Sequence, residues 1–217
     1  MNPTIQFTHL QPNRVFLNQQ EFILGDLKNN KIQYSFTQIL PFLEALGKEK
    51  FGSNFQIFKR NYDTLFKLAC YMVKDKLMCQ KFGLDPNKGI LLTGNSGTGK
   101  TTIMKLLPYI TPHKVQYSLI PTRKLIFEFN TSGFSIFHSI LSTRVYCFDD
   151  LGLELTAKHY GEKCELMGEI LLNRCDTFDE TGILTHATTN LNTDELEHRY
   201  GKRVRTRLKR MFNLLTL

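Results

Sequence analysis

Apolar residues along this chain fall into short runs separated by stretches with helical spacing. Apolar runs suited to buried strands occupy residues 89–93, 115–120, 144–148, 183–189 and 212–217. A helical pattern runs from Asn54 to Met78, ahead of the first of these runs. Strands that alternate with helices predict an α/β protein, a three-layer sandwich whose mostly parallel sheet is covered on both faces.

The first fifty residues follow a different pattern. They are polar and nearly neutral, and they contain one helical stretch from Thr37 to Leu46, which Gly47 is expected to end and Pro41 to kink or delay. We therefore expect a small, mainly helical N-terminal region in residues 1–53. One larger domain would occupy residues 54–217, and the N-terminal region would bind a partner.

A phosphate-binding motif follows the run at residues 89–93. Residues 94–101 read Gly-Asn-Ser-Gly-Thr-Gly-Lys-Thr and fit the pattern G-x-x-x-x-G-K-[ST], and a short helix that Pro108 ends comes next. Glycines allow backbone N–H groups to surround a polyphosphate, while Lys100 reaches its β- and γ-phosphates and Thr101 joins the Mg²⁺ shell. The predicted ATP-binding residues are Gly94, Asn95, Ser96, Gly97, Thr98, Gly99, Lys100, Thr101 and Thr102. The order of strand, loop and helix disfavours a glycine-rich turn without a ligand.

Two acids end a later apolar run. Val145-Tyr146-Cys147-Phe148 leads into Asp149 and Asp150, and ligands of parallel sheets collect at the carboxyl ends of the strands. We expect Asp149 to hold the metal, directly or through water, and Asp150 to orient or deprotonate the attacking water. A strand that ends in a polar turn looks the same, but the complete phosphate loop about fifty residues earlier favours the functional interpretation.

The run at residues 183–189 ends in hydroxyls and an amide, Thr188-Thr189-Asn190. Asn190 is suited to position the lytic water or to sense the γ-phosphate, and equally suited to end a strand in a turn. Both interpretations stay open. His186, in the middle of the run, is expected to be a packed residue rather than a catalyst.

Composition limits the class of protein and the compartment in which this chemistry is expected. The 217 residues include 41% hydrophobic and 22% charged residues, and no apolar run approaches the length of a membrane helix. The first residues have no basic stretch followed by an apolar core, so no secretory signal is visible. Five scattered cysteines form no C-x-x-C pair, which disfavours zinc and a disulfide framework. We expect a cytoplasmic protein without membrane contact.

The net charge of +8 is concentrated near the C-terminus. Residues 198–217 contain seven Lys or Arg and no Asp or Glu, whereas the rest of the chain has 21 basic and 20 acidic side chains. The segment is consistent with a nucleic-acid patch, with γ-phosphate ligands or with a solvated helix face.

These motifs, in this order, resemble the AAA+ ATPases of the DnaC/DnaI helicase-loader and IstB transposition-helper group. The resemblance covers roughly residues 54–217. Its more specific marks are Asp149-Asp150-Leu151-Gly152, Tyr160-Gly161-Glu162, Asn173-Arg174, Thr188-Thr189-Asn190-Leu191 and Tyr200-Gly201 with Thr206-Arg207-Leu208. The resemblance implies an arginine finger that completes the ATP site of a neighbouring subunit, best matched by Arg207, with Arg203 and Arg205 as alternatives.

The resemblance also sets expectations for partners. It implies an ATP-dependent homo-oligomer, weakly active as a monomer, that binds single-stranded DNA and a replicative helicase or a transposase. Residues 118–143 lie where the group places a helical insertion that faces DNA, but here four phenylalanines accompany only two basic residues. Core packing is the expected role for most of these rings. The chain stops soon after its last predicted strand, so the C-terminal helical lid is expected to be missing.

The preferred function is an ATP-hydrolysing DNA replication accessory, with ATP and Mg²⁺ as ligands. An IstB-like transposition helper is the alternative within the same group. From other classes, a small nucleoside or metabolite kinase shares the phosphate loop, and a nucleotide-binding scaffold without turnover shares the motifs. The acids at 149–150 and the arginine-rich segment favour the ATPase over the kinase.

Overall fold

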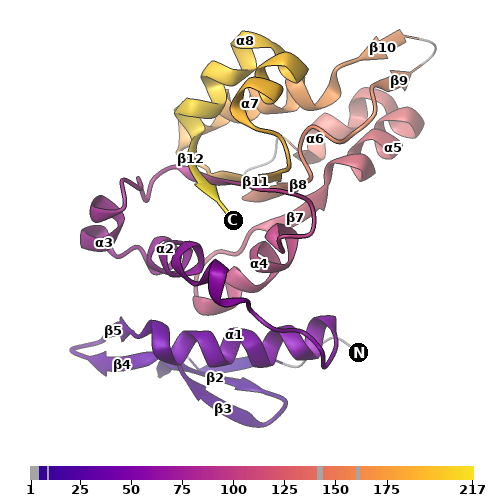
Figure 1. Cartoon of the computed structure of the whole chain (residues 1–217). Coiled ribbons are helices and arrows are strands. Elements are labelled where there is room, and N and C mark those ends of the chain that lie inside the picture. The colour runs from indigo at the N-terminus through magenta and orange to yellow at the C-terminus, as the bar shows by residue number, and fades with distance from the viewer. Residues whose placement is uncertain (1–4, 9, 141–143, 160–161) are drawn as a thin grey trace. The chain divides into compact units, whose positions relative to one another are not determined.

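The computed structural model describes residues 5–8, 10–140, 144–159 and 162–217 (Figure 1). The chain forms two compact units. The first unit contains residues up to 84 together with 102–116, and the second contains residues 85–101 and 117–217. Tyr160 and Gly161, two of the residues that carry the family resemblance, lie outside the described residues, as do residues 141–143 of the expected DNA-facing insertion.

The first unit starts with strands. Its first sheet is antiparallel, in the order β1-β2-β3, and a separate hairpin pairs β4 with β5. The strands are β1 (Ile5–Thr8), β2 (Gln11–Leu17), β3 (Gln20–Ile23), β4 (Gly25–Lys28) and β5 (Lys31–Tyr34). The helices of this unit are α1 (Phe36–Phe51), η1 (Lys59–Asn61), α2 (Tyr62–Val73), α3 (Lys76–Lys81) and η2 (Leu107–Ile110).

The prediction of a mainly helical N-terminal region was wrong, because two tight turns fold this segment into hairpins. Asn18 and Gln19 connect β2 to β3, and Asn29 and Asn30 connect β4 to β5. All four have positive φ, between 47° and 74°, as two-residue hairpin turns of type I′ require. Asparagine tolerates this conformation better than most residues do. Short strands, with alternating burial in β1, β2 and β5, then fit the segment better than helices do.

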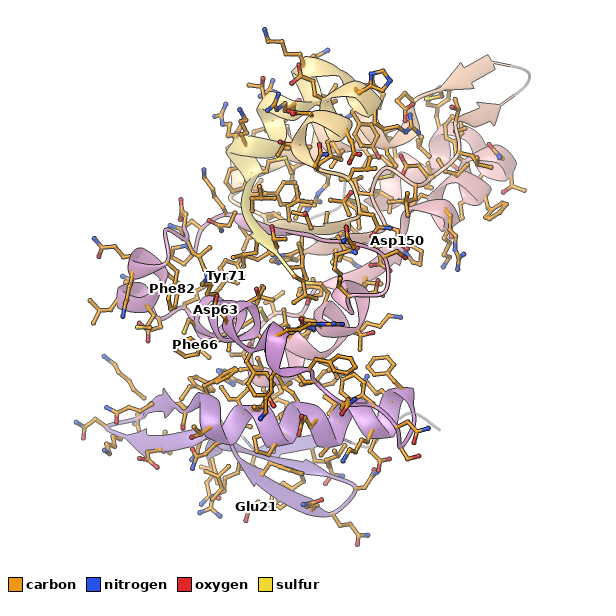
Figure 2. All side chains as sticks on the ribbon, viewed as in Figure 1. Glu21, Asp63, Phe66, Tyr71, Phe82 and Asp150 are labelled. Atoms are coloured by element: carbon orange, nitrogen blue, oxygen red, sulfur yellow. The ribbon has the colours of Figure 1, made fainter. Side chains whose placement is uncertain are left out.

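The expected helix at residues 37–46 is present as α1, but it continues past Gly47 to Phe51. Gly47 is buried, and a Cβ there would lie 1.9 Å from the Phe55 ring. This glycine therefore permits close packing and does not end the helix. The helical pattern from residue 54 forms α2 and α3, where the rings of Phe66 and Phe82 meet edge to face with centroids 5.8 Å apart (Figure 2).

The second unit contains the predicted parallel sheet. Its five strands are all parallel, in the order β12-β6-β11-β8-β7. They are β6 (Gly89–Thr93), β7 (Ser118–Pro121), β8 (Tyr146–Asp149), β11 (Thr185–Thr189) and β12 (Phe212–Thr216). All five predicted strands are therefore confirmed, although three of them begin two or three residues later than the apolar runs do. Outside the sheet, β9 (Ala157–His159) and β10 (Glu162–Cys164) form a hairpin.

Helices flank these strands in sequence. They are α4 (Lys100–Leu106), α5 (Thr122–Ser132), η3 (Gly133–Ser135), α6 (Ile136–Ile140), α7 (Leu166–Thr181) and α8 (Thr193–Met211). The last two lie side by side (Figure 1). The core of the second unit combines residues of the sheet, such as Phe148 and Ala187, with apolar faces of α5, α7 and α8. No helix within the described ranges is both long and apolar enough to cross a membrane.

One arginine stabilises the sheet from inside. Arg174 of α7 is fully buried, and burial lowers its pKa. Its guanidinium donates to the Thr185 hydroxyl at 2.9 Å and to the carbonyl oxygens of Arg144 and Leu184, each at 3.1 Å. These acceptors precede β8 and β11 or lie at the start of β11. Arg174 therefore orders the amino ends of the strands, opposite to the edge where the acids lie.

Candidate nucleotide-binding site

The predicted functional residues lie together because their strands are parallel. The phosphate loop follows β6, Asn190 follows β11, and Asp149 and Asp150 end β8. Thr189 pairs with Thr93, and Ala187 pairs with Phe148, so the three strands end at similar heights on one edge of the sheet. Since β11 lies between β6 and β8, its last residues separate the phosphate loop from the acids.

Backbone geometry explains the glycines of the phosphate loop. Gly94, Gly97 and Gly99 have φ values of 145°, 78° and 96°, a region that side chains disfavour. Gly94 also lacks space, since a Cβ there would lie 2.4 Å from the Leu217 carbonyl oxygen. Residues 95–97 are exposed, and α4 starts at Lys100. The loop thus presents backbone amides at the beginning of a helix, where anions bind favourably.

Lys100 lies under this loop. Its side chain is 5% exposed, and Nζ donates to the carbonyl oxygens of Gly94 at 2.7 Å and Asn95 at 2.9 Å. The third partner of Nζ is Oδ1 of Asn190, at 2.5 Å. Burial lowers the pKa of Lys100, and the charges of Asp150 and Asp149 oppose this effect. The Lys100 amine therefore lies between the phosphate loop and the end of β11, and its role as a phosphate ligand stays a prediction.

A second link joins α4 to β8. The Thr101 hydroxyl donates to Oδ1 of Asp149 at 2.8 Å, and the Thr188 hydroxyl donates to the same oxygen at 2.7 Å. Asp149 is 5% exposed. Oxygen atoms of a carboxylate and a hydroxyl are ligands that Mg²⁺ accepts, together with phosphate oxygens and water. The donor set of Thr101 and Asp149 therefore fits the metal that the phosphate loop predicts.

Hydrogen bonds of its backbone hold Asp150 in place, and the residue is exposed. Its φ is 60°, its N–H donates to the Thr188 hydroxyl at 2.9 Å, and its carbonyl oxygen accepts from the Thr122 hydroxyl at 3.0 Å. Within the described ranges its carboxylate makes no hydrogen bond. Burial and the charge of Asp149 raise its pKa, while Lys100 and Arg123 act in the opposite direction. A carboxylate in this position is available to a water molecule.

Thr188 and Thr122 are residues of the candidate site to which the sequence assigned no role, although Thr188 belongs to one of the motifs. Thr188 connects both acids, since its hydroxyl accepts from the Asp150 amide and donates to Asp149. Threonine at the end of a strand gives no sequence signal of its own, because strands favour this residue generally. Knowledge of the pairing between β8 and β11 is needed to place it.

His186 is packed, as expected. It is 4% exposed, Nδ1 accepts from the Ile90 N–H at 3.1 Å, and its ring lies 4.8 Å from that of Tyr117. Burial lowers its pKa to about 4. The imidazole therefore stays neutral within the sheet.

The basic C-terminal segment forms part of α8, and four of its seven basic side chains pair with acids on α7, on the first turns of α8 or at Glu154 and Glu165. Arg199 pairs with Glu154 and Glu165, Arg205 with Asp194 and Glu197, Arg207 with Asp176 and Asp179, and Arg210 with Asp179. Arg207 lies 3.6 Å from each of its two partners on α7 and is 30% exposed. Arg203 is exposed, and no hydrogen bond or ion pair joins it to the described part of the chain. Within the described ranges, no hydrogen bond or ion pair joins Arg203, Arg205 or Arg207 to the phosphate loop.

The segment with four phenylalanines divides into packed and exposed rings. Phe129 of α5 is 1% exposed, and Phe137 is half-buried. In contrast, Phe127 and Phe134 are 70% and 67% exposed, and Arg123 and Lys124 occupy the first turn of α5. Two of the four rings therefore pack in or against the core and two are accessible, so core packing holds for half of the rings rather than for most of them.

Comparisons with known proteins identify the fold. No family model and no curated protein sequence matches the chain. The crystal structure of the DnaC helicase loader is 18% identical and matches with a TM-score of 0.54, covering 76% of this chain and 94% of its own. DnaI is 19% identical with a TM-score of 0.55, covering 76% of this chain and 88% of its own.

A putative primosome component from Streptococcus pyogenes serotype M3 is similar to the same extent. It is 17% identical, has a TM-score of 0.54 and covers 76% of this chain and 84% of its own. Sequence identities this low show a similarity of fold alone. The chain has an α/β fold with a five-stranded parallel sheet that matches the DnaC and DnaI loaders, as the sequence motifs indicated.

Proposed function

We propose that this protein binds and hydrolyses ATP as an AAA+ type P-loop ATPase with a three-layer core. The observation that carries the proposal is the convergence of four groups at the carboxyl ends of β6, β8 and β11. These groups are the Lys100 amine, the oxygen pair of Thr101 and Asp149, the Asp150 carboxylate and the Asn190 amide. Amine, metal-binding oxygens and a free carboxylate are the parts that transfer of a phosphoryl group to water needs.

The phosphate loop and Lys100 would bind the triphosphate. Nζ of Lys100 now donates to two carbonyl oxygens and to Asn190, and β- and γ-phosphate oxygens would take over these hydrogen bonds. Thr101 and Asp149 would hold Mg²⁺. This ion would supply positive charge that neutralises the negative charge developing on the phosphates.

Asp150 and Asn190 would act on the attacking water. The Asp150 carboxylate is exposed, and its backbone is fixed by Thr188 and Thr122, so it can accept a proton from a water molecule beside the γ-phosphate. Asn190, once released by Lys100, offers an amide that can orient the same water. Arg207 of a neighbouring subunit would neutralise charge on the transferring phosphoryl group, because its planar guanidinium is always charged.

For the biological role, we propose a DNA replication accessory that binds single-stranded DNA and a replicative helicase in an ATP-dependent way. The fold likeness to DnaC and DnaI supports this role over that of a transposition helper. Exposed Phe127 and Phe134, with Arg123 and Lys124 near them in sequence, would contact DNA by stacking and charge. Residues 1–53 would bind the protein partner.

One experiment tests the ATPase directly. Lys100→Met removes the buried amine, and Lys105→Met is the matched control, because Lys105 is exposed on the same helix. We expect calorimetry to show ATP binding by the parental protein and by Lys105→Met, and an affinity at least about a hundredfold lower for Lys100→Met. Equal ATP affinity of all three proteins would contradict the proposed site.

The product distinguishes an ATPase from a kinase. An ATPase releases inorganic phosphate from ATP and Mg²⁺ without any other substrate. We expect phosphate release that increases with protein concentration more steeply than linearly, since a neighbouring subunit would complete the site. ATP consumption that requires an added nucleoside or metabolite would favour the kinase instead.

A further inference from the structure

Glu154 is a buried acid outside the proposed ATP site. It follows Asp150 by four residues, and its side chain is fully buried. Oε2 accepts from the Gly152 N–H at 2.9 Å, and Oε1 accepts from the Tyr200 hydroxyl and lies 3.4 Å from Nη2 of Arg199. A buried carboxylate is stable only when donors surround it in this way.

The first of these donors belongs to the turn that carries Asp150. Gly152 has a φ of 95°, and a Cβ there would lie 2.3 Å from Cδ1 of Leu191, the residue after Asn190. The same turn is tied to β11 by Leu151, whose N–H donates to the Thr188 carbonyl oxygen at 2.8 Å. Glu154 therefore adds a further contact to a turn that is already tied to β11.

The other two donors belong to α8. Arg199 and Tyr200 directly precede Gly201, whose φ of 84° and ψ of 162° interrupt the helix. The basic side chains from Lys202 to Arg210 follow this interruption. Glu154 thus binds the last two residues of the first half of α8, at the point from which the arginine-bearing half departs.

We propose that Glu154 is a positioning residue that fixes the Asp150 turn and the Gly201 interruption of α8 in one arrangement. The inference rests on the proposed ATPase activity. Glu154 touches neither the phosphate loop nor Asp149, so it acts through the Gly152 amide on Asp150 and through Tyr200 on the second half of α8. Misplacement of a water-orienting carboxylate by about 1 Å lowers turnover strongly without weakening substrate binding.

Three variants test this role. Glu154→Met keeps a similar volume and removes both oxygen acceptors, whereas Glu154→Gln keeps an oxygen for the Gly152 N–H. Glu165→Gln is the matched control, because Glu165 pairs with Arg199 but makes no contact with the turn. We expect Glu154→Met to lower kcat by about tenfold or more with KM and ATP affinity unchanged within about twofold. Glu154→Gln should restore most of the turnover, and Glu165→Gln should retain it.

If Glu154→Met has the parental kcat, or if Glu154→Gln loses as much kcat as Glu154→Met does, the positioning role is wrong. Either result leaves the ATPase proposal standing. A parental protein that binds no ATP would overturn both. If Glu154→Met fails to fold, Tyr200→Phe provides the test, because it removes one donor and keeps the ring. We expect Tyr200→Phe to lower kcat by about threefold at unchanged KM, and parental kcat in this folded variant would overturn the role.

Discussion

The Thr101 hydroxyl donates a hydrogen bond to Oδ1 of Asp149 at 2.8 Å, across 48 residues of sequence. The contact joins the first turn of α4 to the end of β8. Thr188 donates to the same oxygen, so two hydroxyls hold one carboxylate oxygen at the beginning of the helix. If Thr101 and Asp149 hold Mg²⁺, as we propose, their oxygen atoms lie within hydrogen-bond distance of each other at this point.

The first prediction concerns this hydroxyl. Thr101→Val keeps the shape of the side chain and removes the oxygen, whereas Thr101→Ser keeps the oxygen. Loss of a metal ligand should lower the affinity for ATP with Mg²⁺ by about tenfold or more in Thr101→Val, and Thr101→Ser should stay close to the parental value. Calorimetry with Mg²⁺ and with EDTA measures the difference. A Val variant that keeps the full Mg²⁺ dependence of ATP binding would place the metal elsewhere.

The second prediction concerns the pH dependence of turnover. Burial and Asp149 raise the pKa of Asp150, and a general base must be deprotonated to act. Turnover should therefore increase with pH, and the midpoint of this increase should lie above the ordinary pKa of an aspartate. Asp150→Asn should bind ATP with parental affinity, lose about a hundredfold or more of kcat and lose this acid limb. An unchanged pH profile in Asp150→Asn would show that the limb belongs to another group.

Local sequence predicted the parts of the site but not the links between them. The run at residues 89–93 and the phosphate loop are contiguous, so their order alone predicted β6, the loop and α4. The role of Thr188 depends on β11 lying between β6 and β8, which no local pattern specifies. Long-range strand order, rather than residue type, determines which hydroxyl meets Asp149.

The N-terminal region shows a different kind of error. Asn29-Asn30 between Lys28 and Lys31 is a signal for a two-residue hairpin, because both residues must adopt positive φ. An Asn-Asn pair indicates such a turn less strongly than the usual Asn-Gly pair does. Gly47 was interpreted as a helix end, although its function is to admit the Phe55 ring, a contact that only the tertiary structure reveals.

The third prediction links a buried histidine to stability. Burial lowers the pKa of His186 from 6.5 to about 4, so between these values the unfolded chain binds more protons than the folded one. Stability is then fully present above pH 6.5 and is lost as pH falls toward 4. From pH 7 to pH 5 this group should reduce the free energy of unfolding by about 2 kcal/mol. Urea titrations measure it, and the loss should be smaller in His186→Gln, which can still accept from the Ile90 amide.

The fourth prediction concerns single-stranded DNA. If Phe127 and Phe134 stack on bases, the double change to alanine should weaken binding by about 2 kcal/mol or more without altering its salt dependence. The double change Arg123→Ala and Lys124→Ala should instead flatten the salt dependence, because fewer counterions are released. Fluorescence anisotropy with ATP at several salt concentrations separates the two effects. Binding that none of these changes affects would place the DNA on another surface.

The last prediction concerns assembly. Arg207 is partly exposed and is held by two ion pairs of 3.6 Å and by a 3.9 Å contact of Nη1 with the Cys175 sulfur. Such weak contacts contribute little to stability, so Arg207 can be released to a neighbouring subunit. We therefore expect Arg207→Ala to fold and to bind ATP normally, yet to hydrolyse none. Arg203→Ala and Arg205→Ala, assayed in parallel, should keep most of the turnover.

Mixing identifies the subunit in which the arginine acts. A Lys100→Met subunit has an intact Arg207, and an Arg207→Ala subunit has an intact phosphate loop, so their shared interface contains one complete site. We expect phosphate release from the mixture and none from either variant alone. If instead Arg203→Ala is inactive alone and phosphate release returns when it is mixed with Lys100→Met, the arginine that acts in the neighbouring site is the exposed Arg203. Activity that stays proportional to protein concentration, without rescue in any mixture, would place these arginines outside a shared site.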